Sequence, residues 1–234
     1  MDLVQPTLCP FCWEFNQLNP RVLQILAGRG IKSRILSTVG DCLAICGVGA
    51  LTPGYILLIS RSHYESVGYF PDKLMEELKQ IKAEIRYFLK SVYGSASFFE
   101  HGATRSDPAG CCVGHAHMHA LPTDKDFHFI LAKNFRERIV YEIDELTNFS
   151  TLDKPYLFYE SPDESKYLYE VPPNLSSQQL RKLWAESMNK PMKWDWAVFP
   201  EIDNMITTLK DFQDFVNAQH YYPGELYNSS EVHS

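Results

Sequence analysis

The first third of the chain alternates short apolar runs with turn-forming residues. Three such runs follow one another after residue 30, and Gly or Pro residues separate them. Apolar runs of four to eight residues between Gly and Pro are typical of β-strands. The pattern predicts strands of an antiparallel sheet within SRILSTVG, CLAICGVGAL and GYILLISRSH, which are residues 33–40, 42–51 and 54–63.

Residues 71–94 follow a longer period. Apolar side chains recur here every three or four positions, which places them on one face of a helix. Asp72 stands near the start of this segment and Gly94 stands just past its end, as helix termini favour. The pattern predicts one long amphipathic helix with apolar positions at Leu74, Met75, Leu78, Ile81, Ile85, Phe88, Leu89 and Val92.

The chain after this helix predicts further strands. ASFFEHGA and GHAHMHALP indicate two strands joined by the loop TRSDPAGCC. Beyond Pro122, aromatic-rich runs predict a hairpin at KPYLFYE and KYLYEVPP, and helices are expected at about 176–188 and 201–216. This order predicts an α+β fold: an antiparallel sheet flanked by a long helix, with an α/β C-terminal extension.

Composition narrows the class of protein. The 234 residues are 45% hydrophobic and 22% charged, which is typical of one compact folded unit with a full core. No run approaches the roughly 20 apolar residues of a membrane span, and the N-terminus lacks the pattern of a secretory signal. We therefore expect no membrane association and a cytoplasmic location.

Charge and cysteine content argue against an extended nucleic-acid-binding face and against disulfide bonds. The net charge of −7 argues against an extended face for nucleic acid, because such a face needs clustered Lys and Arg. Any anionic ligand must be held by a local site. The six cysteines stand in a chain without an export signal, so disulfides are not expected.

The segment GHAHMHAL, residues 114–121, places histidine at every second position. In an extended strand, alternate side chains lie on one face about 7 Å apart, so His115, His117 and His119 would share a site. On a helix, the middle ring would point away from the other two. Upstream, PAGCCVG is a small, turn-prone loop whose backbone N–H groups could bind a phosphate. The combination indicates phosphoryl chemistry.

This histidine segment resembles the signature of the histidine-triad (HIT) superfamily of nucleotide hydrolases and transferases, His-φ-His-φ-His-φ-φ, where φ is apolar. The resemblance extends back through FFEHG, the long helix and ILLISRSH to CPFC. It implies an α+β fold on an antiparallel sheet. It also implies a HIT-like catalytic core at residues 1–124, with a C-terminal extension at 125–234 packed on it.

The resemblance implies roles for single residues. His117 would attack the α-phosphorus of a nucleotide, and His119 would hydrogen-bond the phosphate. The expected substrates are dinucleoside polyphosphates or nucleoside phosphoramidates, and a homodimer is compatible with the family. The substrate-binding residues would be Gly110, Cys111 and Cys112 around the phosphate, Glu100 near the active site and Phe11 at the base. A purely structural role suits Glu100 and Phe11 equally well.

The motif CPFC gives Cys9 and Cys12 the two-residue gap of a metal site, although a buried or redox-active pair has the same spacing. The HIT resemblance supplies two partners, because one zinc-bearing branch completes a Cys-Cys-His-His site. The matching residues here are His63 and His115. The implied cofactor is a structural Zn²⁺ with four protein ligands.

Two other functions stay open from the sequence. One is a zinc-dependent metallohydrolase that uses the strand histidines as ligands, and the other is a non-catalytic nucleotide-binding module. In the extension, Gln178, Arg181, Trp194 and Trp196 could reach over the pocket to bind the distal half of a long substrate. The alternative for this segment is a capping helix with aromatic core packing.

Overall fold

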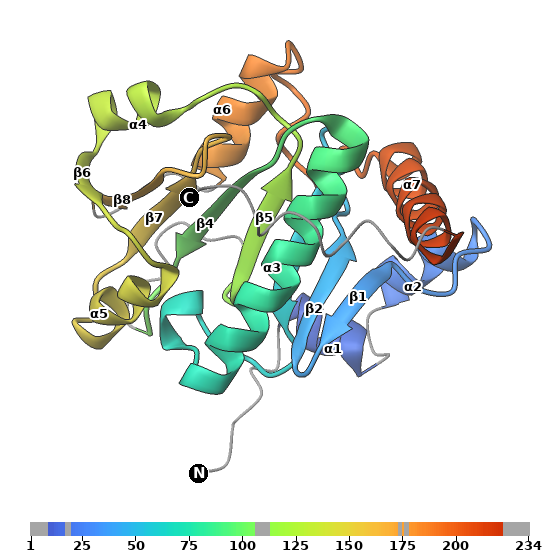
Figure 1. Cartoon of the computed structure of the whole chain (residues 1–234), viewed down its shortest axis with the longest axis horizontal. Helices are drawn as coiled ribbons and strands as arrows, with labels where there is room; N and C mark the ends of the chain where they lie inside the picture. Colours follow the sequence, from blue (N-terminus) through green and yellow to red (C-terminus); the bar gives the residue numbers. More distant parts are fainter. Residues whose placement is uncertain (1–8, 17–19, 106–112, 173–174, 176–177, 222–234) are drawn as a thin grey trace, which may run out of the picture.

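The computed structural model describes residues 9–16, 20–105, 113–172, 175 and 178–221 (Figure 1). The helices are α1 (Pro10–Phe15), α2 (Pro20–Ala27), α3 (Asp72–Tyr93), α4 (His128–Asn134), α5 (Leu146–Thr151), α6 (Gln179–Ser187) and α7 (Ile202–Tyr221), with short 3-10 helices η1 (Val67–Tyr69) and η2 (Ile143–Glu145). The strands are β1 (Ile35–Val39), β2 (Cys42–Cys46), β3 (Ile56–Ser60), β4 (Ser97–Gly102), β5 (His117–Leu121), β6 (Arg136–Ile139), β7 (Tyr156–Glu160) and β8 (Lys166–Glu170). Within these ranges, none of the helices offers the length of apolar chain that a bilayer span requires.

The described strands form one sheet of eight in the order β1-β2-β3-β5-β4-β7-β8-β6, and every neighbouring pair is antiparallel. The predicted α+β fold with an antiparallel sheet and a long flanking helix is confirmed. Strand β6 was not predicted. Its sequence, Arg-Glu-Arg-Ile, is exposed throughout, so it lacks the apolar alternation that marks a half-buried strand.

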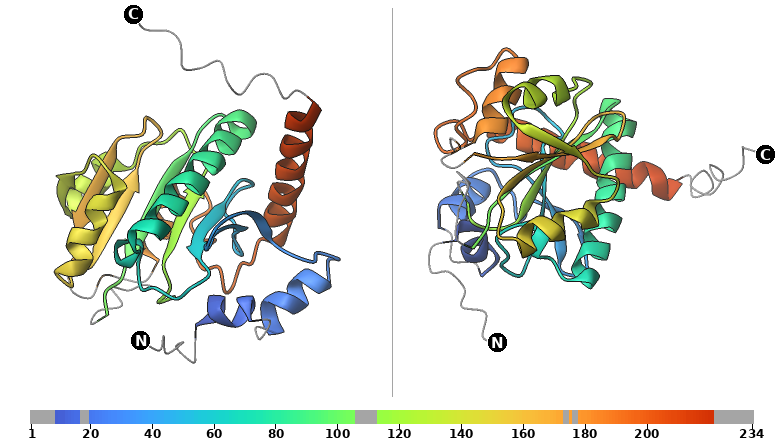
Figure 2. Two further views of the ribbon diagram at one scale, coloured as in Figure 1. Left: turned by 60° about the horizontal axis from the view of Figure 1, so that its bottom comes forward. Right: turned by 90° about the vertical axis from the view of Figure 1, so that its left-hand side faces the viewer.

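Helix α3 covers one face of the sheet, and α1 and α6 lie on the other (Figure 2). The apolar stripe of α3 is buried against β-strand residues that include Met118 and Ala120 of β5. Gly94 ends the helix with φ +84°, a left-handed conformation that favours glycine. The opposite face of the sheet carries a second core, in which Phe99, Leu121 and Trp184 are buried.

The C-terminal half of the chain continues the sheet of the N-terminal half. Strand β7 pairs with β4 along its whole length, and β8 and β6 follow outward. Helix α7 packs near α3, where the rings of Phe88 and Phe212 lie 5.0 Å apart between centroids. The predicted division at residue 124 falls between β5 and α4, within this continuous sheet.

A buried carboxylate joins the long helix to the strands of the extension. Glu160, at the end of β7, is fully buried and accepts hydrogen bonds from Lys82 and Arg86 of α3. Both cations also lie over the ring of Phe98, at 4.6 and 4.7 Å from its centroid. The charge of Glu160 therefore balances two cations that are largely removed from water.

The substitution Glu160→Gln should lower the free energy of unfolding by about 3–5 kcal/mol, because it removes the counter-charge of buried Lys82 and the nearer of the two counter-charges of Arg86. The matched control is Glu164→Gln, whose half-exposed carboxylate pairs with Lys90 on the same helix and should contribute less than about 1 kcal/mol. Urea unfolding of both variants beside the parent chain measures the difference. Equal losses in the two variants would contradict the assignment.

Candidate functional site

Strand β5 lies in the middle of the sheet, between β3 and β4, and brings the histidines together. His119 pairs with Leu57 of β3 and Phe99 of β4. The even-numbered neighbours of the histidines pack under α3, so the imidazoles lie on the opposite face. The ring centroids of His117 and His119 are 4.9 Å apart.

His117 is held by the backbone of its own strand. Its Nδ1 lies 2.6 Å from the carbonyl oxygen of His115. A carbonyl oxygen only accepts, so Nδ1 of His117 carries the proton and Nε2 keeps its lone pair. Burial lowers the pKa of His117. The hydrogen bond to the His115 carbonyl raises this pKa, but by less than burial lowers it. The ring is therefore neutral near pH 7, with a nucleophilic or accepting nitrogen at Nε2.

His119 is held by side chains instead. Its Nδ1 lies 2.7 Å from the hydroxyl oxygen of Tyr55, and its ring stacks on Phe99 with 4.2 Å between centroids and 8° between planes. Burial lowers the pKa of His119 well below its usual range, and the neighbouring His117 and Arg181 lower it further. His119 is thus a second neutral imidazole beside His117.

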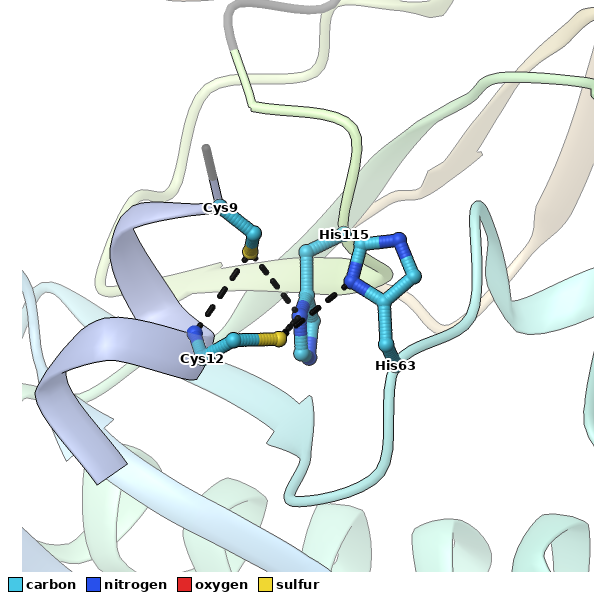
Figure 3. Close-up of side chains that lie close together, drawn as sticks. All are labelled: Cys9, Cys12, His63 and His115. Atoms are coloured by element: carbon cyan, nitrogen blue, oxygen red, sulfur yellow. Dashed lines mark hydrogen bonds between the residues drawn. The ribbon is translucent and has the colours of Figure 1, made fainter. Parts of the chain in front are cut away.

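The four predicted metal ligands lie close together (Figure 3). The sulfur of Cys9 is 3.4 Å from Nδ1 of His115, and the sulfur of Cys12 is 3.4 Å from Nδ1 of His63 and 3.6 Å from Nδ1 of His115. The four ligand atoms lie within 4.8 Å of one another, so the cluster can hold one metal ion.

Local hydrogen bonds orient the ligand atoms of Cys9 and His115 toward the centre of the cluster. Cys9 caps helix α1, and its sulfur accepts a hydrogen bond from the backbone N–H of Cys12. Nε2 of His115 lies 2.8 Å from the carbonyl oxygen of Ser60, so Nε2 donates and Nδ1 presents its lone pair to the sulfurs. Burial lowers the pKa of His115 to about 4, which keeps this ring in the neutral form that a metal requires.

Phe11 lies beside two histidines, the metal-cluster residue His115 and the triad residue His117. Its ring centroid is 5.5 Å from that of His115 and 5.7 Å from that of His117. The structure therefore brings Phe11 to the histidines, and its role at the base stays a prediction. The proposed phosphate cradle, Gly110, Cys111 and Cys112, lies outside the described residues, and its role stays a prediction.

The structure does not bring Glu100 to the histidines. Its neighbour Phe99 stacks on His119, whereas Glu100 faces the α3 side of the sheet. There its carboxyl group accepts hydrogen bonds of 2.7 Å from the backbone N–H of Val67 and 2.7 Å from the hydroxyl of Tyr156. Burial raises the pKa of Glu100 to about 7, although both hydrogen bonds lower it.

Arg181 does not extend into solvent for a substrate. It is buried, and its guanidinium donates to the carbonyl oxygens of Trp194 and Gly49 and to the hydroxyl of Tyr55. Its contacts match the alternative expectation of a capping helix with aromatic packing. Sequence reasoning missed Tyr55 and Phe99 at the site, because the apolar pattern predicts both as core residues of strands.

Together, the antiparallel sheet, the histidines of its central strand and the adjoining cysteine–histidine cluster define an α+β protein with a histidine-lined site. Residues 29–126 match the sequence model of the HIT domain. The HIT resemblance inferred from the histidine triad is therefore confirmed for residues 29–126.

Among curated proteins, the chain is similar to CWF19-like protein 1 of Mus musculus, with 24% identity over 185 residues that cover 73% of this chain and 33% of that protein. It is 22% identical to CWF19-like protein 1 of Xenopus laevis over 209 residues, which cover 81% of this chain and 37% of that protein. The chain thus spans about a third of the length of these relatives.

Two solved structures of HIT proteins are also similar. A histidine triad protein from Clostridium difficile shares 20% identity with a TM-score of 0.37, over 53% of this chain and 96% of that one. A HIT family protein from Bacillus anthracis shares 16% identity with a TM-score of 0.39, over 63% of this chain and 96% of that one.

The buried carboxyl group of Glu100 predicts a pH-dependent stability difference between the parent chain and Glu100→Gln. The folded pKa of about 7 exceeds the ordinary value of 4.5, so the folded state favours the protonated form. The stability of the parent relative to Glu100→Gln should therefore be highest below about pH 4.5. It should fall by about 3 kcal/mol as the pH rises to about 7, and then level off.

Thermal or urea unfolding of the two chains between pH 4.5 and pH 8 measures this difference, and the subtraction removes the titration of all other groups. A constant difference across this range would show that the carboxyl group is not protonated preferentially in the folded state.

Proposed function

We propose that this chain is a nucleotide hydrolase or nucleotidyl transferase that cleaves at the α-phosphate through a covalent nucleotidyl–His117 intermediate. Residues 29–126 match the HIT domain, and the resemblance of the histidine triad implies a nucleotide hydrolase or transferase. The observation that carries the proposal is the state of His117: a neutral ring, with Nδ1 bonded to the His115 carbonyl and the Nε2 lone pair left for a ligand.

In the first step, Nε2 of His117 donates its lone pair to the α-phosphorus and forms a P–N bond. The bond from phosphorus to the bridging oxygen or nitrogen breaks, and the leaving group takes that electron pair and a proton from solvent. In the second step, water or another acceptor attacks phosphorus, loses a proton and returns the P–N electron pair to His117. His119, 4.9 Å away between centroids, would hydrogen-bond the phosphoryl oxygens in both steps.

The substrate class follows from this chemistry. Dinucleoside polyphosphates and nucleoside phosphoramidates both carry an α-phosphorus bonded to a leaving group that this sequence of steps can release. Phe11, beside His117, offers an aromatic edge or face for the base. The predicted backbone cradle at Gly110, Cys111 and Cys112 would hold the phosphate oxygens.

The cysteine–histidine cluster fits a structural Zn²⁺. Tetrahedral zinc with Zn–S bonds of about 2.3 Å and Zn–N bonds of about 2.0–2.1 Å places sulfur and nitrogen ligands roughly 3.5 Å apart. The three short S···N distances here are 3.4, 3.4 and 3.6 Å. Zn²⁺ held by Cys9, Cys12, His63 and His115 would fix α1, and with it Phe11, against the histidine strand.

This cluster also argues against a metallohydrolase. Four protein ligands complete a tetrahedral site and leave no position for the water that such an enzyme activates. Neither His117 nor His119 belongs to the cluster, and each of these rings has its Nδ1 bonded to another protein group.

The intermediate predicts label on one histidine. The full chain, mixed with an AMP-amidate or diadenosine substrate labelled at the α-phosphate and quenched in base, should carry label on the peptide that contains His117. His117→Ala should lose this label and at least about 10³-fold in kcat, because the nucleophile is gone.

The control for this experiment is His128→Ala. His128 lies on α4, where its Nδ1 bonds to the hydroxyl of Tyr169 and its ring stacks on Tyr167. Label and kcat should persist in this variant. Equal label in His117→Ala and the parent would exclude the intermediate, and tight nucleotide binding without turnover would indicate a binding module.

The metal cluster predicts binding of one equivalent of Zn²⁺ or Co²⁺, with cobalt–thiolate absorption typical of a tetrahedral site. At a free metal concentration 100 times Kd, binding contributes about 2.7 kcal/mol, so metal removal should lower Tm by roughly 5–10 °C. Cys12→Ser should abolish the thiolate signal of Cys12 and most of the stabilisation. The control is Cys42→Ala, which removes a buried thiol outside the cluster and should bind the metal like the parent. Full metal binding by Cys12→Ser would contradict the site.

A further inference from the structure

We infer that helix α6 of the extension positions His119, and that Arg181 and Tyr55 set which of its ring nitrogens carries the proton. The inference deepens the proposed function, on which its kinetic part rests. Two separate contacts carry it: a chain of hydrogen bonds through Tyr55, and a stack of rings through Phe99.

The hydrogen-bond chain starts from a fixed guanidinium. In Arg181, Nε donates to the carbonyl oxygen of Trp194 at 2.9 Å, Nη2 to that of Gly49 at 2.8 Å, and Nη1 to the hydroxyl of Tyr55 at 3.0 Å. The side chain is only 6% exposed. Three acceptors in three directions prevent rotation of the planar group, so Nη1 always presents a donor to Tyr55.

The direction of the next hydrogen bond follows from proton counting. A guanidinium can only donate, so it uses a lone pair of the Tyr55 oxygen. Burial raises the pKa of Tyr55, which keeps the hydroxyl protonated, and its hydrogen needs an acceptor. Nδ1 of His119, at 2.7 Å, is that acceptor. Nδ1 of His119 is therefore unprotonated, and Nε2 carries the hydrogen.

The ring stack fixes the plane of the same imidazole. Phe99 lies between His119 and Trp184, with centroids 4.2 Å from His119 and 4.5 Å from Trp184. Trp184 is fully buried and contacts Phe127 on its other side, at 4.2 Å between centroids. Arg181 and Trp184 are three residues apart on α6 and thus share one face of the helix.

The two neighbouring histidines consequently have opposite tautomers. His117 carries its proton on Nδ1 and leaves the Nε2 lone pair, whereas His119 has the Nδ1 lone pair occupied and presents Nε2–H. One ring can attack phosphorus while the other donates a hydrogen bond to a phosphoryl oxygen. Arg181 and Tyr55 act through His119 and are positioning residues.

The direct test is the ¹⁵N NMR spectrum of the full chain labelled at histidine, with the His119 signals assigned by His119→Gln. The parent should show His119 with a hydrogen-bonded, unprotonated Nδ1 and a protonated Nε2. In Tyr55→Phe and in Arg181→Met, both signals should move toward the averaged positions of exchanging tautomers. This measurement needs no substrate, so it is independent of the proposed reaction.

The kinetic test compares kcat and KM for the substrate of the proposed reaction. Tyr55→Phe should lower kcat roughly 10-fold with little change in KM, because the donor from His119 acts mainly on developing charge. The matched control is Lys190→Met. Lys190 also connects the extension to the core, because it donates a hydrogen bond to the carbonyl oxygen of Leu51, but it does not contact His119. In Lys190→Met, the tautomer of His119 and the value of kcat should therefore stay as in the parent.

Three results would overturn the inference: a parent His119 protonated at Nδ1, a Tyr55→Phe spectrum identical to that of the parent, or losses in Lys190→Met equal to those in Tyr55→Phe. An inactive parent chain that shows the expected tautomer would instead refute the proposed reaction and leave the positioning of His119 intact.

Discussion

The structure depends on one constraint, the alternation of side chains along β5 in the centre of the sheet. Ala116, Met118 and Ala120 are buried under α3, and this burial forces the intervening histidines to the other face. A shift of one residue in the register of β5 would exchange core and site completely. The packing that stabilises the fold is therefore also what assembles the imidazoles.

A second regularity follows from this strand: each histidine has one ring nitrogen committed to another protein group. Nε2 of His115 donates to the Ser60 carbonyl, Nδ1 of His117 donates to the His115 carbonyl, and Nδ1 of His119 accepts from Tyr55. In the proposed function, the remaining nitrogens would serve as a metal ligand, a nucleophile and a hydrogen-bond donor. Three identical side chains differ in chemistry because their partners differ.

The sequence predicts the parts of this arrangement that depend on periodicity. The alternation of the triad, the stripe of α3 and the spacing of Cys9 and Cys12 are all local patterns, and the structure has the corresponding elements. Glu100 shows a limit of motif comparison. Its position next to Phe99 on a strand already implies that the two side chains lie on opposite faces, and Phe99 is the one that contacts His119.

Local sequence patterns do not predict contacts between segments that are far apart in the chain. Arg181 is separated by 126 residues from Tyr55, and nothing in the local sequence of either residue indicates that they meet. An arginine near a predicted site suggests phosphate binding, yet the acceptors of this arginine are backbone carbonyls and a buried hydroxyl. Strand β6 was missed for a different reason, since an exposed edge strand has no apolar face to reveal it.

These long-range contacts show that the segments before and after residue 124 pack as one unit. Strand β7 covers the edge of β4, the strand that carries Phe99, and α6 covers the face on which His119 lies. Without them, β4 would present unpaired backbone groups and an apolar surface to water. The boundary is therefore one of sequence resemblance rather than of packing. The histidine that donates to phosphate in the proposed reaction depends on residues from both sides of it.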